Sequence, residues 1–183
     1  MKTVKDRELL EKARLFDEQA LAEIYDLWSP VLYRYSLRLL GEADLAEECV
    51  SETFSRFLAA LQHGSGPREY LQAYLYRIAH NWITDHYRRS TPLLMPLEPD
   101  LAADAEQDPQ QAFAIDVERQ RVRAALSYLT PDQRQVIMLK FVEELDNKTI
   151  AAALNKPVGA VKALQHRALE SLRQILSSEK KSS

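Results

Sequence analysis

The sequence predicts an all-α protein made of two small helical domains joined by an acidic, proline-containing linker. The 183 residues include only four glycines and no strand-like alternation of Val, Ile and Thr, while helix-forming residues are abundant. With 46% hydrophobic and 28% charged residues, the chain can bury a core. Apolar residues recur at helical spacing on both sides of residues 90–118, a segment with seven acidic residues and no lysine or arginine.

The first helical stretch covers residues 17–40, and the Ser29-Pro30 pair is expected to divide it into two helices. Serine suits the N-cap and proline the first helical position. Gly41 is expected to end the second of these helices. The next helix is predicted over residues 44–62, and its inward positions are Leu45, Cys49, Phe54, Leu58 and Leu61. The alternative function for the single cysteine, Cys49, is a redox sensor, but its apolar neighbours favour a small buried side chain.

A helix over residues 70–89, YLQAYLYRIAHNWITDHYRR, follows a Gly- and Pro-containing loop at residues 63–67. A helical wheel divides this helix into two faces. The core face holds Leu71, Leu75, Ile78, Ala79, Trp82 and His86. The opposite face holds Tyr70, Tyr74, Arg77, Asn81, Thr84 and Arg88. Aromatic rings can stack on unpaired bases while cations hold phosphates, so the second face suits a single strand. The alternative is a surface helix with half-buried tyrosines.

Residues 90–118 contain four of the eight prolines and are expected to form an extended tether without a core. Helix is expected to resume near Ala112. The predicted domains are therefore residues 1–89 and residues 119–178, and the lysine- and serine-rich residues 179–183 form a frayed tail.

The second domain contains a helix-turn-helix pattern. Thr130-Pro131-Asp132-Gln133 is a capping box that starts one helix. In residues 147–166, Ala151 lies where two helices must approach closely, and Asn155 occupies a turn that needs a left-handed backbone. The apolar contacts between the two helices are expected at Ile150, Leu154, Val158 and Val161.

The outer face of the second helix in this pattern is small at its tip and basic further along. Its residues are Pro157, Gly159, Ala160, Lys162, Ala163, His166 and Arg167. Residues 119–183 carry twelve basic and six acidic residues, which favours phosphate binding. Such a helix can enter a DNA major groove. The alternative is a plain helical hairpin with a solvated basic face.

Three stretches together resemble a bacterial extracytoplasmic-function sigma factor of RNA polymerase. They are ADLAEECVSETFSRFLAAL at 43–61, LYRIAHNWITDHYRR at 75–89 and LTPDQRQVIMLKFVEELDNKTIAAALNKPVGAVKALQHRAL at 129–169. The resemblance covers nearly everything except the linker and both tails. It implies a dissociable specificity subunit that directs core polymerase to promoters and opens the strands.

The resemblance also implies roles for individual residues. Contacts to the clamp helices of core polymerase fall on Asp44, Glu47, Glu48, Ser51, Glu52, Phe54 and Arg56. Recognition and melting of the minus-ten element fall on the loop at 63–70 and on Tyr70, Tyr74, Arg77, Asn81, Asp85, Arg88 and Arg89. Recognition of the minus-thirty-five element falls on Lys148, Pro157, Gly159, Ala160, Lys162, Ala163, His166 and Arg167.

The implied partners are core RNA polymerase, at its clamp helices and flap, promoter DNA in duplex and single-stranded form, and an anti-sigma factor. The acidic linker would lie along the polymerase toward the RNA exit path. The chain departs from the family where Glu144-Leu145-Asp146 replaces Gly-Leu-Ser, where Asn155 replaces the turn glycine, and where Ala163-Leu164-Gln165 replaces Ser-Arg-Leu. His80 and Trp82 also replace commoner small or basic residues.

Two other functions compete with this interpretation. One is a stand-alone helix-turn-helix regulator that binds duplex DNA without polymerase. The other is a small helical enzyme using Asp85, His86 and nearby carboxylates, but no Gly-rich phosphate loop, Cys/His cluster or nucleophile elbow supports catalysis. We therefore expect no enzyme activity, metal or cofactor. The charged N-terminus MKTVKDRELLEKARLF has no apolar signal or membrane segment, which predicts a cytoplasmic, nucleoid-associated protein without membrane insertion.

Overall fold

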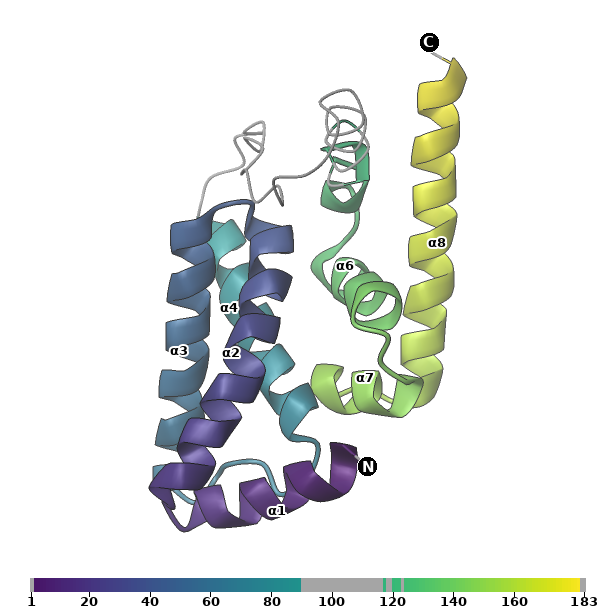
Figure 1. Ribbon diagram of the computed structural model, residues 1–183. Helices are drawn as coiled ribbons and strands as arrows, with labels where there is room; N and C mark the ends of the chain where they lie inside the picture. The colour runs from purple at the N-terminus through teal and green to yellow at the C-terminus, as the bar shows by residue number, and fades with distance from the viewer. Residues whose placement is uncertain (1, 90–116, 118–119, 123, 182–183) are drawn as a thin grey trace.

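A computed structural model describes residues 2–89, 117, 120–122 and 124–181. Within these residues all regular structure is helical, which confirms the predicted all-α class (Figure 1). The predicted tether at 90–118, apart from residue 117, and the expected helix start near Ala112 lie outside the described residues.

The first domain consists of α1 (Lys2–Arg14), α2 (Glu18–Leu40), α3 (Ala43–Gln62) and α4 (Leu71–Arg89). Asp17 caps α2, because its Oδ1 accepts a hydrogen bond from the Ala20 N–H at 2.8 Å. Gly41 ends α2 in the left-handed conformation, with φ 77°. The predicted break at Ser29-Pro30 is wrong, since α2 continues through Pro30. Packing overrides the local signal there: Trp28 and Leu32, on either side of the proline, are both buried.

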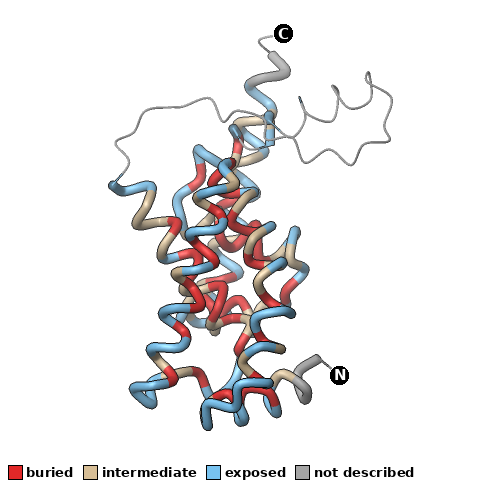
Figure 2. The backbone as a smooth tube through the Cα atoms, turned by 60° about the vertical axis from the view of Figure 1, so that its left-hand side comes forward, coloured by how far each residue is buried: buried red, intermediate tan, exposed pale blue. Residues whose placement is uncertain are grey.

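The core of this domain lies between α2, α3 and α4, and buried residues run along the inner sides of the packed helices (Figure 2). Tyr35 of α2 and Tyr76 of α4 meet edge to face with ring centroids 5.0 Å apart. Phe57 of α3 is fully buried, whereas Leu58, expected to face inward, is exposed. Leu58 is one residue out of register with the buried stripe of Val50, Thr53, Phe54, Phe57 and Leu61.

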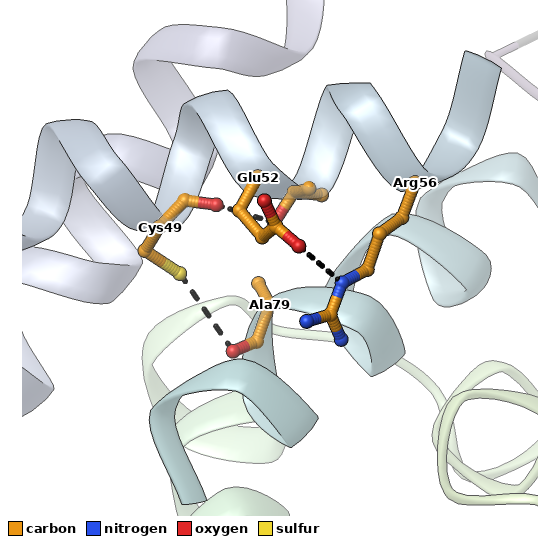
Figure 3. A network of polar contacts seen from close by, with 5 residues as sticks. Cys49, Glu52, Arg56 and Ala79 are labelled. Atoms are coloured by element: carbon orange, nitrogen blue, oxygen red, sulfur yellow. Dashed lines mark hydrogen bonds and ion pairs between the residues drawn. The ribbon is translucent and has the colours of Figure 1, made fainter. Parts of the chain in front are cut away.

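Cys49 is buried where α3 packs on α4, which confirms its prediction as a small core residue. Its Sγ lies 3.7 Å from the carbonyl oxygen of Ala79, and its own carbonyl accepts a hydrogen bond from Thr53 Oγ1 at 2.7 Å (Figure 3). Burial raises the pKa of the Cys49 thiol to about 11. Little thiolate is therefore present at neutral pH, which disfavours a redox role.

The second domain contains α6 (Pro131–Ile137), the π-helix η1 (Met138–Val142), α7 (Asn147–Leu154) and α8 (Val158–Lys181), preceded by helical residues at 120–122 and 124–127. The capping box at Thr130 and Gln133 is present. Glu144 takes a left-handed backbone, with φ 54°, and Asp146 caps α7 by accepting from the Thr149 N–H at 2.7 Å. That hydrogen bond lowers the pKa of the Asp146 carboxyl. The chain thus fills the Gly and Ser positions of the family pattern with other residues.

Asn155 forms the turn between α7 and α8 with φ 52° and ψ 46°, as predicted. Ile150 and Val161 are fully buried and Ala151 nearly so, which confirms the close approach of the two helices. Val158 was expected in this contact but is exposed, because it stands at the first position of α8. Helix α8 continues to Lys181, beyond the predicted domain end at 178.

We expect Asn155→Ala to lower the free energy of unfolding by about 1 kcal/mol, because alanine lacks the local hydrogen bonding that lets asparagine occupy the left-handed region. Asn155→Gly should change it by no more than about 0.5 kcal/mol, since glycine adopts this backbone freely. The side chain is exposed, so little burial is lost in either variant. Urea denaturation measures both. Equal destabilisation by alanine and glycine would contradict the role of the turn backbone.

The two domains pack against each other. Helix α4 of the first domain lies against α7 of the second, with α8 on the far side of α7 (Figure 1). One continuous cluster of buried apolar residues includes Tyr76 of α4 together with Leu139, Ile150 and Val161 of the second domain. The chain is therefore closed across its domain boundary.

Candidate nucleic-acid and polymerase interface

The loop before α4 is held in place by α1. Arg14 Nη1 donates hydrogen bonds to the carbonyl oxygens of Gly66 and Pro67, at 3.5 and 3.2 Å. A Cβ added at Gly66 would stand 2.6 Å from Leu61 Cδ2, so the loop packs tightly on the end of α3. Tyr70 follows with φ 54° and an exposed ring. The loop therefore presents an aromatic side chain at the entrance to α4.

The outer face of α4 brings together most of the residues predicted to bind the minus-ten element. The Arg77 guanidinium lies 5.1 Å from the centroid of the Tyr74 ring, a cation–π arrangement. Asn81 is exposed one turn further on, and Arg88 and Arg89 are exposed at the end of the helix. Asp85 lies 3.9 Å from Arg88, in an exposed ion pair. An aromatic ring, an amide and several cations thus share one face.

Tyr74 also belongs partly to the core. Its ring meets Phe57 edge to face at 6.2 Å, and the side chain is half-buried. The alternative of half-buried tyrosines therefore holds for Tyr74 but not for Tyr70, which is 51% exposed. In the predicted site the Tyr74 ring is held by packing against the core, whereas the Tyr70 ring is exposed to solvent.

The predicted core face of α4 needs one correction, because its buried histidine is His80 rather than His86. His80 lies between Tyr35 and Thr84, with ring nitrogens 3.4 Å and 3.2 Å from their hydroxyl oxygens. His86 is half-buried and stacks on the half-buried Trp82, with ring centroids 5.4 Å apart. The buried stripe is therefore rotated around the helix axis relative to the stripe that the helical wheel predicted. The positions that the wheel missed are Ala73, Tyr76, His80 and Ile83, and Thr84, expected on the outer face, is only half-exposed.

Helix α3 presents an exposed acidic face. Most of the residues predicted to contact polymerase are exposed there: Asp44, Glu47, Glu48, Ser51 and Arg56. Glu52 is half-exposed and pairs with Arg56 at 2.7 Å (Figure 3). Phe54 does not fit a contact role, because its ring is buried and packs on Tyr25 at 4.8 Å. Tyr25 of α2, which the sequence analysis did not single out, is the exposed ring of that pair.

The outer face of α8 is open to solvent. Pro157, Gly159, Lys162, Ala163, His166, Arg167 and the nearby Lys148 are all exposed, and Ala160 is half-exposed. Gln165 Nε2 donates to Asn147 Oδ1 at 2.8 Å and ties α8 to the start of α7. Lys156 pairs with Asp132 of α6 at 3.1 Å. These contacts set the orientation of α8 within its domain.

Polar contacts between the two domains were not among the predictions from the sequence. Glu143, directly after η1, lies 3.1 Å from Arg38 of α2 and accepts a hydrogen bond from the Tyr76 hydroxyl at 2.6 Å. Burial and the Glu143 carboxylate raise the pKa of Tyr76, so the phenol stays protonated as a donor. The Arg134 guanidinium lies 5.5 Å from the centroid of the Tyr87 ring. Helical periodicity gives no signal for these contacts, because the two partners of Glu143 lie 105 and 67 positions away along the chain.

Within the described residues, no group of three or more His, Cys, Asp or Glu side chains is arranged to hold a metal ion. None of the helices described is long and apolar enough to cross a membrane.

Comparison with known proteins matches both domains. Residues 24–92 match sigma-70 region 2 and residues 119–172 match sigma-70 region 4. The ECF RNA polymerase sigma factor SigL of Mycobacterium tuberculosis is 32% identical over 157 residues, covering 84% of this chain and 86% of SigL. SigW of Bacillus subtilis is 27% identical, covering 91% and 94%. BldN of Streptomyces coelicolor is 29% identical, and the match covers 92% of this chain but only 65% of BldN.

Two solved structures share the fold. CnrH, in complex with the cytosolic domain of CnrY, has a TM-score of 0.69 at 23% identity, covering 94% of this chain and 97% of CnrH. RpoE of Bartonella quintana, in complex with the anti-sigma factor NepR, has a TM-score of 0.62 at 23% identity, covering 85% and 96%.

Proposed function

The chain belongs to the extracytoplasmic-function sigma factors of bacterial RNA polymerase, and we propose that its three exposed faces divide the work of transcription initiation among them. In this proposal α3 docks on core polymerase, α8 reads the upstream promoter element as duplex, and α4 captures the downstream element as a single strand. Promoter DNA, core polymerase and an anti-sigma factor are the proposed partners, in the cytoplasm and at the nucleoid.

The observation that carries the proposal is the outer face of α4. Tyr70 offers an exposed ring, and the Tyr74–Arg77 pair offers a ring and a guanidinium already stacked. Unstacking a base costs a few kcal/mol, and stacking on a protein ring returns about 1 to 3 kcal/mol per base. Binding energy alone can thus offset melting, so no hydrolysed cofactor is required.

The other two faces fit their proposed roles by charge and shape. The carboxylates of α3 suit a basic surface on the polymerase, and the cations of α8 suit DNA phosphates. A Cβ at Gly159 would meet nothing within 4 Å, so the fold does not require a glycine there. The small residues at the tip of α8 instead leave room for a closely approaching base-pair edge. We place readout of the minus-thirty-five element at this tip and at Lys162, His166 and Arg167.

The stand-alone regulator is the less favoured function, because both domains match sigma-70 regions. Such a regulator would bind duplex sites as a dimer without polymerase. The sigma factor should bind promoter DNA only weakly until core polymerase is present.

The test is to combine the purified chain with core polymerase and a promoter library, and to follow strand opening by permanganate reactivity of unpaired thymines. We expect opening only with all three components. Glu48→Lys should weaken capture of core polymerase on immobilised protein by about tenfold, because it reverses a charge on the α3 face. Glu8→Lys, the same change at an exposed position of α1, is the matched control. Tight polymerase-independent binding to duplex by a dimer would refute the proposal.

A further inference from the structure

The contact between the two domains contains one carboxylate that is bonded to both α2 and α4. Glu143 Oε1 lies 3.1 Å from Arg38 Nη1, and Glu143 Oε2 accepts from the Tyr76 hydroxyl at 2.6 Å. The Glu143 side chain is only 12% exposed, whereas Arg38 is 45% exposed. From these contacts we propose that Glu143 is a latch that holds the free sigma factor in a closed state unable to engage both promoter elements.

Three features of the surrounding interface fit a specific, reversible contact. Leu139 and Ile150 of the second domain are fully buried in the same cluster as Tyr76. The Arg134 guanidinium lies over the Tyr87 ring of α4. Arg134 is itself fixed by hydrogen bonds to the carbonyl oxygens of Leu126, Ser127 and Leu129, at 2.9 to 3.3 Å. The domains are therefore docked in one register by polar contacts placed around an apolar centre.

The position of Glu143 depends on the π-helix before it. The Glu143 N–H donates a hydrogen bond to the carbonyl oxygen of Met138, five residues back, at 3.0 Å. The Leu145 N–H donates to the carbonyl oxygen of Leu139 at 2.9 Å. A π-turn accommodates one residue more than an α-turn and redirects the side chains that follow it. Short π-helices are frequent at functional positions. The local distortion thus places the carboxylate at the domain boundary.

The closed state limits the reach of the protein, and this step rests on the function proposed above. The minus-ten and minus-thirty-five elements are about 25 base pairs apart, which corresponds to about 85 Å of duplex. A packed chain of 183 residues has a radius of gyration of about 16 Å, so it spans only about half that distance. The outer faces of α4 and α8 both remain exposed. Closure therefore prevents simultaneous binding to the two elements, without covering either DNA-binding face.

Opening requires no unfolding of either domain. Residues 90–118 link the domains, and 29 residues can extend to at most about 100 Å. Opening does separate α4 from α7 and Glu143 from its partners, so it has a free-energy cost. If the closed form makes up about 90% of the free protein, the apparent affinity for core polymerase and promoter is reduced about tenfold.

The distance between the domains tests the latch directly. Nitroxide labels are attached to Gln62→Cys on α3 and Gln174→Cys on α8, both exposed, while Cys49 is buried. Double electron–electron resonance of the free, full-length protein should give one short distance. Glu143→Lys, which places a cation beside Arg38, should broaden the distribution and lengthen it. Glu144→Lys makes the same charge change at an exposed neighbour and should keep the short distance.

Two further variants test the latch independently, in case Glu143→Lys lengthens the distance only because it misfolds. The double variant Arg38→Glu/Glu143→Lys restores the pair with reversed charges and should recover most of the short distance. Tyr76→Phe removes a single hydroxyl and should shift part of the population to long distances. If Glu143→Lys and Tyr76→Phe both retain the distribution of the parent protein, the latch is refuted.

The apparent affinity for core polymerase and promoter DNA provides an independent measurement. Glu143→Lys should raise the apparent affinity for core polymerase and a two-element promoter about tenfold relative to Glu144→Lys, because the closed population no longer competes. An unchanged affinity would refute the inhibitory role even if the distance lengthens. Failure of the parent protein to open any promoter with core polymerase would instead refute the proposed function, and the distance measurement would still decide whether Glu143 holds the domains together.

Discussion

Arg77→Ala and Asn81→Ala are each expected to reduce promoter opening at least about tenfold, and together to abolish it, while core-polymerase binding stays unchanged. Arg77 supplies the cation stacked on Tyr74, and Asn81 supplies the exposed amide one turn away. Both contribute only after a base has left the duplex, so their loss raises the cost of melting rather than of docking. In the proposed division of roles core binding depends on α3, which neither substitution touches.

The measurement is permanganate reactivity of the minus-ten thymines, with polymerase capture assayed in parallel. Arg7→Ala and Gln19→Ala remove the same kinds of groups at exposed positions of α1 and α2 and should open promoters normally. A template with a pre-melted minus-ten segment should restore much of the lost initiation in the two variants. Normal opening by both single variants would show that α4 does not capture the single strand.

Lowering the pH from 7 to 4.5 is expected to reduce the free energy of unfolding by about 2 to 3 kcal/mol through His80 alone. Burial lowers the pKa of this imidazole to about 4, against 6.5 for the unfolded chain. The folded protein therefore binds fewer protons than the unfolded protein between these values. The contribution is complete above pH 6.5 and is lost as the pH falls toward 4.

The groups facing His80 come from three helices: Tyr35 of α2, Thr84 of α4, and Asp132 and Arg134 of α6, which act on it electrostatically. Urea unfolding at a series of pH values, compared between the parent protein and His80→Asn, isolates its effect. The variant should lose this part of the acid sensitivity, and His166→Asn, at an exposed site on α8, is the matched control. Parallel pH profiles for His80→Asn and the parent protein would contradict the assignment.

Local rules determined much of the fold. Gly41 ends α2, the capping box starts α6, and Asn155 takes the left-handed turn, as predicted from residue type and spacing. These signals work because each depends on backbone hydrogen bonds and torsions within a few residues. The failures came from packing: Pro30 lies inside a continuous helix, and the buried stripe of α4 runs through His80 rather than His86.

Part of the candidate site could also be predicted from the sequence. The exposed residues at the tip of α8 and on the acidic face of α3 follow from periodicity, since a solvent-facing stripe is the complement of the buried one. Phe54 carried two expectations, an inward position from periodicity and a polymerase contact from the resemblance, and its burial against Tyr25 agrees with the first and does not fit the second.

Residue type and periodicity were enough to predict the helical class, the order of the two domains and the chemistry of each exposed face. The closed arrangement that carries these faces follows from contacts between the domains, which periodicity did not predict. The contact of Glu143 with Arg38 and Tyr76 joins residues 105 and 67 positions apart, and it depends on a π-turn that no periodicity predicts. Contacts between residues far apart in the sequence depend on how the packed helices are placed relative to one another. The spacing of residue types along the chain does not specify that placement.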